Sequence, residues 1–274
     1  MREWINSRTR SPPAMTVLCV LPARLGSRRI PRKPLQPIAG RPLVEWSWRA
    51  ATRVDAFDAV WVATDSEEIA ERVRSFGGTA LLTRTDHPSG TDRVAEVAAR
   101  PEALGFDVLV NYQADEPFLD PEAVTAAVEV VASGRAEVAT VAVPIRDAAE
   151  WRSPSVVKVV RAADGTALYF SRAPVPHPRD GEPEFGSRGA GPYLRHVGVY
   201  VTTRDALERW TGSSPSPLEE IEKLEQLRAL ETGLRIAVVV GAAAGPGVDV
   251  PADLERAERR LAETAPIERV EADD

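Results

Sequence analysis

Positive charge is concentrated in a short segment near the start of the sequence, directly after the apolar run 17–21. Five cations fall within ten residues: Arg24, Arg28, Arg29, Arg32 and Lys33. Prolines and Gly26 keep this segment out of a helix, which leaves backbone N–H groups free to bind an anion. Cations this close repel one another unless an anion lies among them, so the segment indicates a triphosphate site. A solvated basic loop is the alternative, and the sequence has no G-x-x-x-x-G-K-[ST] pattern that would make it a Walker loop.

Two acidic residues follow later apolar runs. Asp115 comes shortly after a run that ends at Val110, and Asp249 follows the run 235–240 and a stretch of small residues. Ligands of doubly wound sheets bind at the carboxyl ends of the strands, where both aspartates would meet the basic segment. Carboxylates together with substrate phosphates are the ligands that Mg²⁺ prefers. Two plainer interpretations stay open from these residues alone: an ordinary acidic turn around Asp115, and Asp249 as the cap of the last helix.

Histidine and serine chemistry is much less favoured by the sequence. His87 and His196 are two of three histidines, and neither lies beside a Cys/His cluster that would indicate zinc. No G-x-S-x-G elbow is present, so a Ser–His–Asp hydrolase is disfavoured. The single cysteine, Cys19, lies within the first apolar run and is expected to be a buried hydrophobic residue.

The elements that must position these residues alternate between short apolar runs and amphipathic stretches. Strands are predicted over 17–21, 59–63, 79–83, 108–110 and 138–143, and helices over 42–53, 66–76, 91–99 and 121–132. Strands this apolar have no face for water, which indicates a three-layer α/β/α fold around a mostly parallel sheet. From about 150 to 203, strand-like runs and a Pro- and Gly-rich stretch predict a β-rich insertion suited to be a lid or a subunit contact.

Length and composition define the expected domain and exclude some partners. We expect a single domain over 16–262, a disordered tail over 1–15 and a C-terminal tail over 263–274, after a last helix that ends at about Ala262. The net charge of −7 argues against a dedicated nucleic-acid surface. No apolar run approaches the ~20 residues that membrane insertion requires. The first fourteen residues lack the apolar centre of a secretory signal, so a cytoplasmic protein is expected.

Taken together, these segments resemble the CMP-Kdo synthetases, the 3-deoxy-manno-octulosonate cytidylyltransferase family. The resemblance covers about residues 16–262. Its landmarks are Pro22-Ala23-Arg24, Lys33-Pro34-Leu35, His87–Arg93, Asp115-Glu116-Pro117, Tyr169–Arg172, His196-Val197-Gly198, Leu224–Arg228 and Gly247-Val248-Asp249. Each motif alone is weak evidence for the resemblance, but all of them together in the family's order are strong evidence.

The resemblance implies an activity as well as a fold. The fold is the nucleotide-diphospho-sugar-transferase-like α/β fold, usually dimeric through its β-rich part. The implied reaction is Mg²⁺-dependent transfer of CMP from CTP to the anomeric hydroxyl of an acidic sugar, with release of pyrophosphate. The implied acceptor is Kdo (3-deoxy-D-manno-octulosonate), which is activated in this way for lipopolysaccharide synthesis.

The resemblance also implies roles for individual residues. Arg24, Arg28 and Lys33 match positions that bind the CTP phosphates, and Asp115 and Asp249 match the pair that holds Mg²⁺. Arg24, Lys33, Asp115 and Asp249 are therefore the expected catalytic residues. Ser89, Gly90 and Thr91 match a loop near the nucleotide base. The positions around the sugar are Gln113, Arg172, His196, Tyr200, Glu225 and Gln226, with Arg172 expected to bind the sugar carboxylate.

Four residues depart from the family pattern without removing a charged catalytic position. They are Arg32 and Ala114 in place of glycine, His177 in place of tyrosine, and Val250 in place of threonine. We expect them to affect the choice of sugar more than the type of reaction. Three alternatives stay open: a cytidylyltransferase for another acid (a sialic-acid-like sugar or a phosphonate), a uridylyl- or guanylyltransferase, and a non-catalytic nucleotide-binding homologue.

Overall fold

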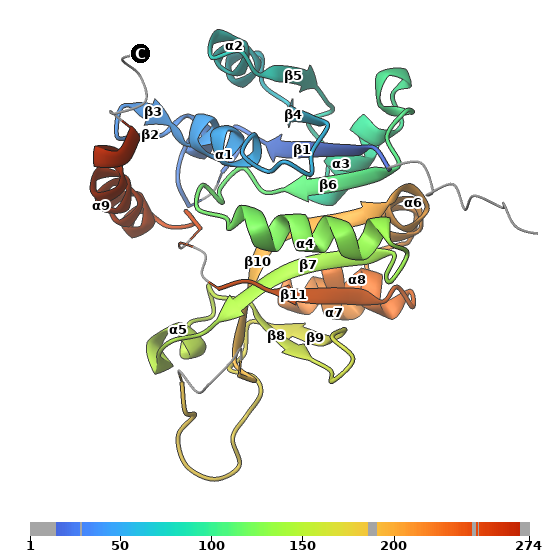
Figure 1. Cartoon of the computed structure of the whole chain (residues 1–274), viewed down its shortest axis with the longest axis vertical. Coiled ribbons are helices and arrows are strands. Elements are labelled where there is room, and N and C mark those ends of the chain that lie inside the picture. Colours follow the sequence, from blue (N-terminus) through green and yellow to red (C-terminus); the bar gives the residue numbers. More distant parts are fainter. Residues whose placement is uncertain (1–14, 28, 186–190, 243–244, 246, 269–274) are drawn as a thin grey trace, which may run out of the picture.

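A mixed β-sheet forms the centre of the molecule. The computed structural model describes residues 15–27, 29–185, 191–242, 245 and 247–268, with side chains to residue 262. Within these residues the sheet has nine strands: β1 (Val17–Ala23), β4 (Ala59–Thr64), β5 (Thr79–Leu82), β6 (Val108–Tyr112), β7 (Val138–Pro144), β8 (Lys158–Arg161), β9 (Ala167–Ser171), β10 (Leu194–Thr203) and β11 (Ile236–Val240). Their order is β11-β7-β10-β6-β1-β4-β5, and the β8–β9 hairpin attaches through β10 (Figure 1).

The sheet is mostly parallel, as the sequence predicts. Strand β1 pairs in parallel with β4 and β6, β4 with β5, and β7 with β11. Strand β10 lies between β6 and β7 and is antiparallel to both, and the β8–β9 hairpin that it carries is also antiparallel.

The position of β10 corrects the expected boundary of the β-rich insertion. Residues 194–203 were assigned to an insertion over one edge, but most of this strand is buried in the middle of the main sheet. The two ends of β10 have different partners: Leu194 and Arg195 pair with β8, and residues 199–203 pair with β6. One long strand therefore belongs both to the insertion and to the core.

Helices cover both faces of the sheet (Figure 1). The helices are α1 (Leu43–Ala51), α2 (Glu67–Ser75), α3 (Gly90–Ala98), α4 (Pro121–Ala132), α5 (Ala148–Arg152), α6 (Arg204–Gly212), α7 (Pro217–Glu222), α8 (Gln226–Glu231) and α9 (Pro251–Glu268). Short 3₁₀ helices (Lys33–Leu35 and Pro101–Ala103) and a small hairpin, β2 (Pro37–Ile38) with β3 (Arg41–Pro42), complete the described elements. Helix α9 continues six residues beyond the expected end at Ala262, so the C-terminal tail is shorter than the sequence indicates.

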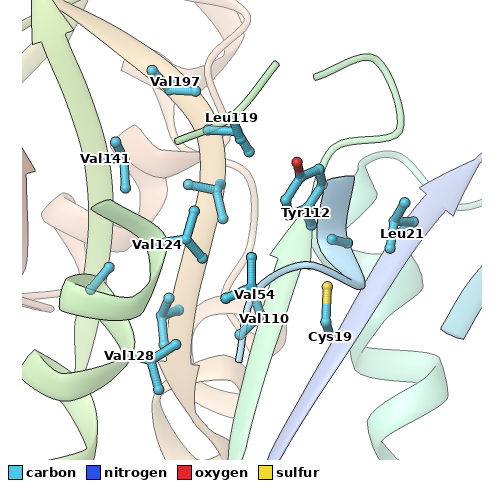
Figure 2. Packing of buried hydrophobic residues seen from close by; sticks show 14 of the residues in the cluster. Cys19, Leu21, Val54, Val110, Tyr112, Leu119, Val124, Val128, Val141 and Val197 are labelled. Carbon is cyan, nitrogen blue, oxygen red and sulfur yellow. The ribbon is translucent and has the colours of Figure 1, made fainter. Parts of the chain in front are cut away.

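The alternation of side chains along β1 explains why both faces are covered. Cys19 and Leu21 belong to a buried cluster that also includes residues of α1, α2 and α4, whereas Leu18 and Val20 belong to a separate cluster with residues of α3. Figure 2 shows Cys19 and Leu21 on β1 beside Tyr112 at the end of β6. Burial raises the pKa of the Cys19 thiol well above its usual value, which fits the expected role of a buried hydrophobic residue.

A second cluster joins the sheet to the segment that follows α7. Trp210 of α6 is fully buried, donates a hydrogen bond from Nε1 to the carbonyl of Glu225 at 3.1 Å, and packs edge-on against Tyr200. No helix among the described residues has both the length and the apolar character needed to cross a membrane.

Replacement of Trp210 tests this packing. We expect Trp210→Ala to lower the free energy of unfolding by about 3–5 kcal/mol, because a large side chain and one buried hydrogen bond are lost. Urea denaturation followed by circular dichroism measures the effect. Leu104→Ala is the control, since Leu104 is 64% exposed and its loss should change stability by less than about 0.5 kcal/mol. Similar unfolding free energies for Trp210→Ala and Leu104→Ala would contradict the role of Trp210 in this cluster.

Candidate active site

Two adjoining cavities open at the carboxyl ends of β1 and β6. The first has a volume of about 340 Å³ and is lined by the basic segment, residues 87–90 and residues 113–115. The second is wider, about 1120 Å³, and extends toward β10, the β8–β9 hairpin and α7. Residues common to both walls are Pro88, Ser89, Gly90, Gln113, Asp115 and Asp249. The two aspartates therefore lie where one cavity passes into the other.

Lys33 holds the two aspartates together. Its ammonium lies 2.5 Å from Asp115 Oδ2 and 3.1 Å from Asp249 Oδ1, and its side chain is only 13% exposed. Burial alone would lower the pKa of Lys33, but the charges of Asp115 and Asp249 outweigh it and raise the pKa. Residues separated by 82 and 216 positions in the sequence thus meet at one cation.

The backbone around the aspartates fixes their direction. The amide of Val248 donates to the carbonyl of Asp115 at 2.9 Å, which joins the loop after β6 to the segment before α9. Asp253 accepts hydrogen bonds from the amides of Asp249 and Val250 at 2.8 and 2.9 Å. Asp253, not Asp249, therefore serves the backbone at the start of α9, and the interpretation of Asp249 as a helix cap is wrong.

The basic segment divides into cations that face the first cavity and cations that do not. Arg24 is exposed at this cavity and forms no ion pair within the part of the chain that the structure describes. Arg29 also lines it and pairs with Asp249 at 3.2 Å. Arg32 pairs instead with Glu68 on α2. Arg28, predicted to bind the phosphates, lies outside the described residues.

Arg32 has a backbone conformation that usually belongs to glycine. Its φ is 54°, in the left-handed region, and it directly precedes Lys33. The resemblance to the CMP-Kdo synthetases implies glycine at this position, and the left-handed conformation gives a physical reason for it. The chain here keeps the turn although arginine is disfavoured in it, and the ion pair with Glu68 accompanies the substitution.

The segment from residue 89 to 91 lies where the two cavities meet. Ser89 caps α3 and lines both cavities together with Gly90. A side chain on Gly90 would lie 2.7 Å from the amide nitrogen of Gln113, so glycine allows this close approach. Thr91 is buried behind the wall, where its hydroxyl donates to Glu225 at 2.6 Å. Thr91 therefore positions Glu225 and does not itself line either cavity.

All six residues predicted to surround the sugar line the second cavity. They are Gln113, Arg172, His196, Tyr200, Glu225 and Gln226. They come from β6, β9, β10 and α8 and from the residues that adjoin these elements. The sequence order gave no indication that a strand of the main sheet, β10, would carry two of them.

The guanidinium of Arg172 is engaged with the main chain. It donates from Nε to the carbonyl of Glu222 at 2.8 Å and from Nη1 to that of Pro154 at 3.1 Å. A third, longer contact of 3.5 Å joins Nη2 to the carbonyl of Lys223. Of five N–H groups, three face backbone carbonyls, so the expected bidentate pair with a sugar carboxylate has to use the remaining two.

His196 is neutral in this environment. Its ring lies between Phe170 and Tyr200, and burial together with the charge of Arg195 lowers its pKa to about 3. The Thr140 hydroxyl donates to the carbonyl of Val199 at 2.6 Å, so at its 2.9 Å contact with His196 it must accept a proton from Nε2. This leaves Nδ1 as a hydrogen-bond acceptor.

Comparisons with known proteins agree with this geometry. The family model for cytidylyltransferases matches residues 18–236. The 3-deoxy-manno-octulosonate cytidylyltransferase of Gemmatimonas aurantiaca is 49% identical over 244 residues, 89% of this chain and 93% of the relative. That of Halorhodospira halophila is 46% identical over 93% of this chain and 99% of its own length. The chain belongs to the 3-deoxy-manno-octulosonate cytidylyltransferase family.

Comparison with solved structures supports membership of the same family. A structure of CMP:2-keto-3-deoxy-manno-octonic acid synthetase complexed with CTP is 40% identical, with a TM-score of 0.81 over 91% of this chain and 99% of that one. A 4-diphosphocytidyl-2C-methyl-D-erythritol synthase from Anaerococcus prevotii has a TM-score of 0.58 at 12% identity and covers 91% of this chain and 97% of that one, so it shares the fold alone. The predicted family, fold class and nucleotidyltransferase class are confirmed.

Glu116 is a site residue of this cytidylyltransferase that the sequence analysis did not select. It lines the second cavity and accepts a hydrogen bond from the amide of Gly198 at 3.2 Å. Burial, with the nearby charge of Asp115, raises its pKa to about 7. Its position directly after Asp115 was the available signal, but its contact depends on the irregular stretch of β10 between Val197 and Tyr200, which the sequence does not reveal.

The low pKa of His196 predicts an acid-sensitive contribution to stability. The unfolded chain takes up a proton near pH 6.5, whereas the folded protein does so only near pH 3. The unfolded state then binds more protons, so this contribution is present above pH 6.5 and is lost as the pH falls toward 3. We expect His196→Gln to lose less unfolding free energy than the wild type between about pH 7 and about pH 5.

Urea denaturation at a series of pH values measures this difference. His177→Gln is the matched control, because His177 is exposed and lines neither cavity. Parallel pH profiles for the wild type and His196→Gln would show that His196 is not the responsible group.

Proposed function

We propose that the chain transfers CMP from CTP to the anomeric hydroxyl of Kdo and releases pyrophosphate. The observation that carries the proposal is the shared rim, where Asp115 and Asp249 lie between a cation-lined cavity and a wider cavity. The names of the relatives, 3-deoxy-manno-octulosonate cytidylyltransferase, and of the structure complexed with CTP support this pair of substrates.

The nucleotide fits the first cavity. In the reaction the anomeric oxygen bonds to the α-phosphorus, the bond to the pyrophosphate oxygen breaks, and the hydroxyl proton is lost. Protein catalysis of such a transfer is mainly positioning and stabilisation of charge. Arg24 at the cavity and Lys33 with its raised pKa would offset the negative charge that develops on the leaving pyrophosphate.

The donor set at the rim suits Mg²⁺. Asp115 and Asp249 already converge on one cation, the ammonium of Lys33, and both are hard oxygen donors. No group of three or more His, Cys, Asp or Glu ligands occurs among the residues that the structure describes. Two carboxylates completed by substrate phosphates and water are typical of Mg²⁺. When bound, the ion would supply charge neutralisation and orientation of phosphate oxygens.

The acid sugar fits the second cavity. Gln113 lies on both walls and so adjoins both substrates, while His196 with its Nδ1 acceptor suits a sugar hydroxyl. Glu225 is held in place by Thr91 from behind the wall. The wall thus offers neutral acceptors, an amide and a carboxylate, which match the many hydroxyl groups of an eight-carbon sugar acid.

Some features that the sequence predicts stay predictions. They are the single domain over 16–262, a homodimer that forms through the β-rich insertion, action in the cytoplasm and a role in lipopolysaccharide synthesis.

A coupled pyrophosphate assay tests the function. With CTP, Mg²⁺ and Kdo present we expect turnover, and omission of any one of them should abolish it. Asp115→Ala should reduce kcat/KM by at least about 100-fold, because the rim loses one of its two carboxylates. Asp164→Ala is the control, since Asp164 pairs with Arg235 on the surface and lines neither cavity.

The same assay separates the alternatives. If the protein prefers a sialic-acid-like sugar or a phosphonate, that acid is the acceptor in place of Kdo. If it prefers UTP or GTP, that nucleotide is the donor in place of CTP. Binding of CTP without pyrophosphate from any acid would favour a non-catalytic homologue. Near-normal turnover of Asp115→Ala would refute its role at the metal.

Lys33 also predicts a property of the free protein. Without nucleotide its ammonium lies between the two carboxylates and competes with any metal ion there. We therefore expect Lys33→Met to bind Mn²⁺ in the absence of CTP at least about tenfold more tightly than the wild type. Electron paramagnetic resonance of free Mn²⁺ measures this affinity. The double variant Lys33→Met/Asp249→Ala should lose the gain, whereas equal affinities of wild type and Lys33→Met would show that the lysine does not compete.

A further inference from the structure

A fully buried lysine stands at the start of β8. Lys158 has no solvent-exposed surface, and its ammonium donates to three main-chain carbonyls. The acceptors are the carbonyls of Ser153 at 2.8 Å, Val156 at 2.6 Å and Arg172 at 2.6 Å. An ammonium group has three N–H donors, so all of them are used within the protein.

Packing alone does not account for a lysine at this position. Burial, reinforced by the charge of Arg172, lowers the pKa of Lys158 to about 8, and only Glu222 acts in the opposite direction. A methionine of similar length would fill the space without the loss of ammonium hydration. The ammonium provides what a methionine lacks, which is three N–H donors. These donors hold carbonyls from separate segments of the chain at one point.

The three carbonyls belong to one wall of the second cavity. Ser153, Val156 and Arg172 all line it, together with Ser155 and Val157 from the same loop. The first cavity includes none of these residues. The contacts of Lys158 therefore affect the wall of the wider cavity and not that of the first cavity.

The wall continues through Arg172 to the segment that carries Glu225. The side chain of Arg172 donates to the carbonyls of Pro154 and Glu222, and its amide donates to the Glu222 carboxylate at 2.9 Å. Ser171 donates to the same carboxylate at 2.6 Å. Glu222 ends α7, and the left-handed turn at Lys223 follows it. A chain of contacts thus runs from Lys158 through Arg172 to the residues just before Glu225.

We propose that Lys158 is a positioning residue for the sugar-acid site: through three main-chain carbonyls it holds the 153–157 loop and Arg172 in the arrangement that the acceptor requires. The assignment of the second cavity to the acceptor rests on the proposed function. Lys158 itself lines neither cavity, and its three acceptor residues line only the second, so its effect falls on acceptor use and leaves nucleotide use unchanged.

Steady-state kinetics of Lys158→Met test the proposal. We expect the acceptor KM to rise at least about tenfold, while the KM for CTP stays within about twofold. The acceptor is the acid that the wild type turns over in the pyrophosphate assay, so a different acceptor from Kdo changes the substrate and not this test. Equal changes in both KM values, or no change in either, would overturn the proposal.

The chain offers a matched control in Arg204. Its guanidinium also donates to three main-chain carbonyls, those of Ala98, Ala103 and Phe106, at the far end of the sheet from the cavities. Arg204→Met removes the same kind of contact, but Arg204 lines neither cavity. We expect it to lower the melting temperature without a change in the acceptor KM. A rise in acceptor KM equal to that of Lys158→Met would show that general loss of stability is the cause.

Hydrogen exchange gives a readout that needs no turnover. In Lys158→Met the amides of residues 153–157 and 222–226 should exchange at least about tenfold faster, while those of residues 87–93 stay unchanged. This result tests the positioning role even if the proposed reaction fails. If Lys158→Met does not fold, Lys158→Gln keeps up to two donors without the charge and should show the same pattern to a smaller degree. Unchanged exchange over 153–157 would contradict the proposal.

Discussion

The contact of Lys33 with two aspartates is the constraint on which the site depends. Two carboxylates at one rim repel each other, and the ammonium between Asp115 and Asp249 makes their proximity favourable. The three residues come from the segment after β1, the loop after β6 and the segment before α9. Because parallel strands end at a common edge, the fold brings these segments together at that edge. The floor of the first cavity and the passage to the second both follow from this arrangement.

The first cavity gathers positive side chains although the chain as a whole is negatively charged. The chain carries a net charge of −7, yet the first cavity is lined by Arg24, Arg29 and Lys33. Two of these cations already pair with carboxylates of the site. In the proposed reaction a bound triphosphate would offer Lys33 an alternative partner and would release the carboxylates for a metal ion. The same charges would then serve the free and the bound protein through an exchange of partners.

The sequence predicted elements better than contacts. The apolar strand over 17–21 and the helix over 121–132 follow from local patterns, and both are seen in the structure. The place of β10 was missed because an apolar strand does not reveal its neighbours. The main-chain contacts of Arg172 and Lys158 were missed for a related reason. Backbone carbonyls are the same at every residue, so no residue type marks the partners of a buried cation.

The four residues that depart from the family pattern do not gather around the second cavity. Ala114 lines the first cavity, Arg32 lies against Glu68, and His177 is exposed outside both. Only Val250 lines the second cavity. The expectation that these residues mainly affect the choice of sugar therefore does not follow from their positions. In the proposed function, selection of the acid would depend on the residues that line the second cavity, among them Arg172, whose main-chain carbonyl accepts a hydrogen bond from Lys158.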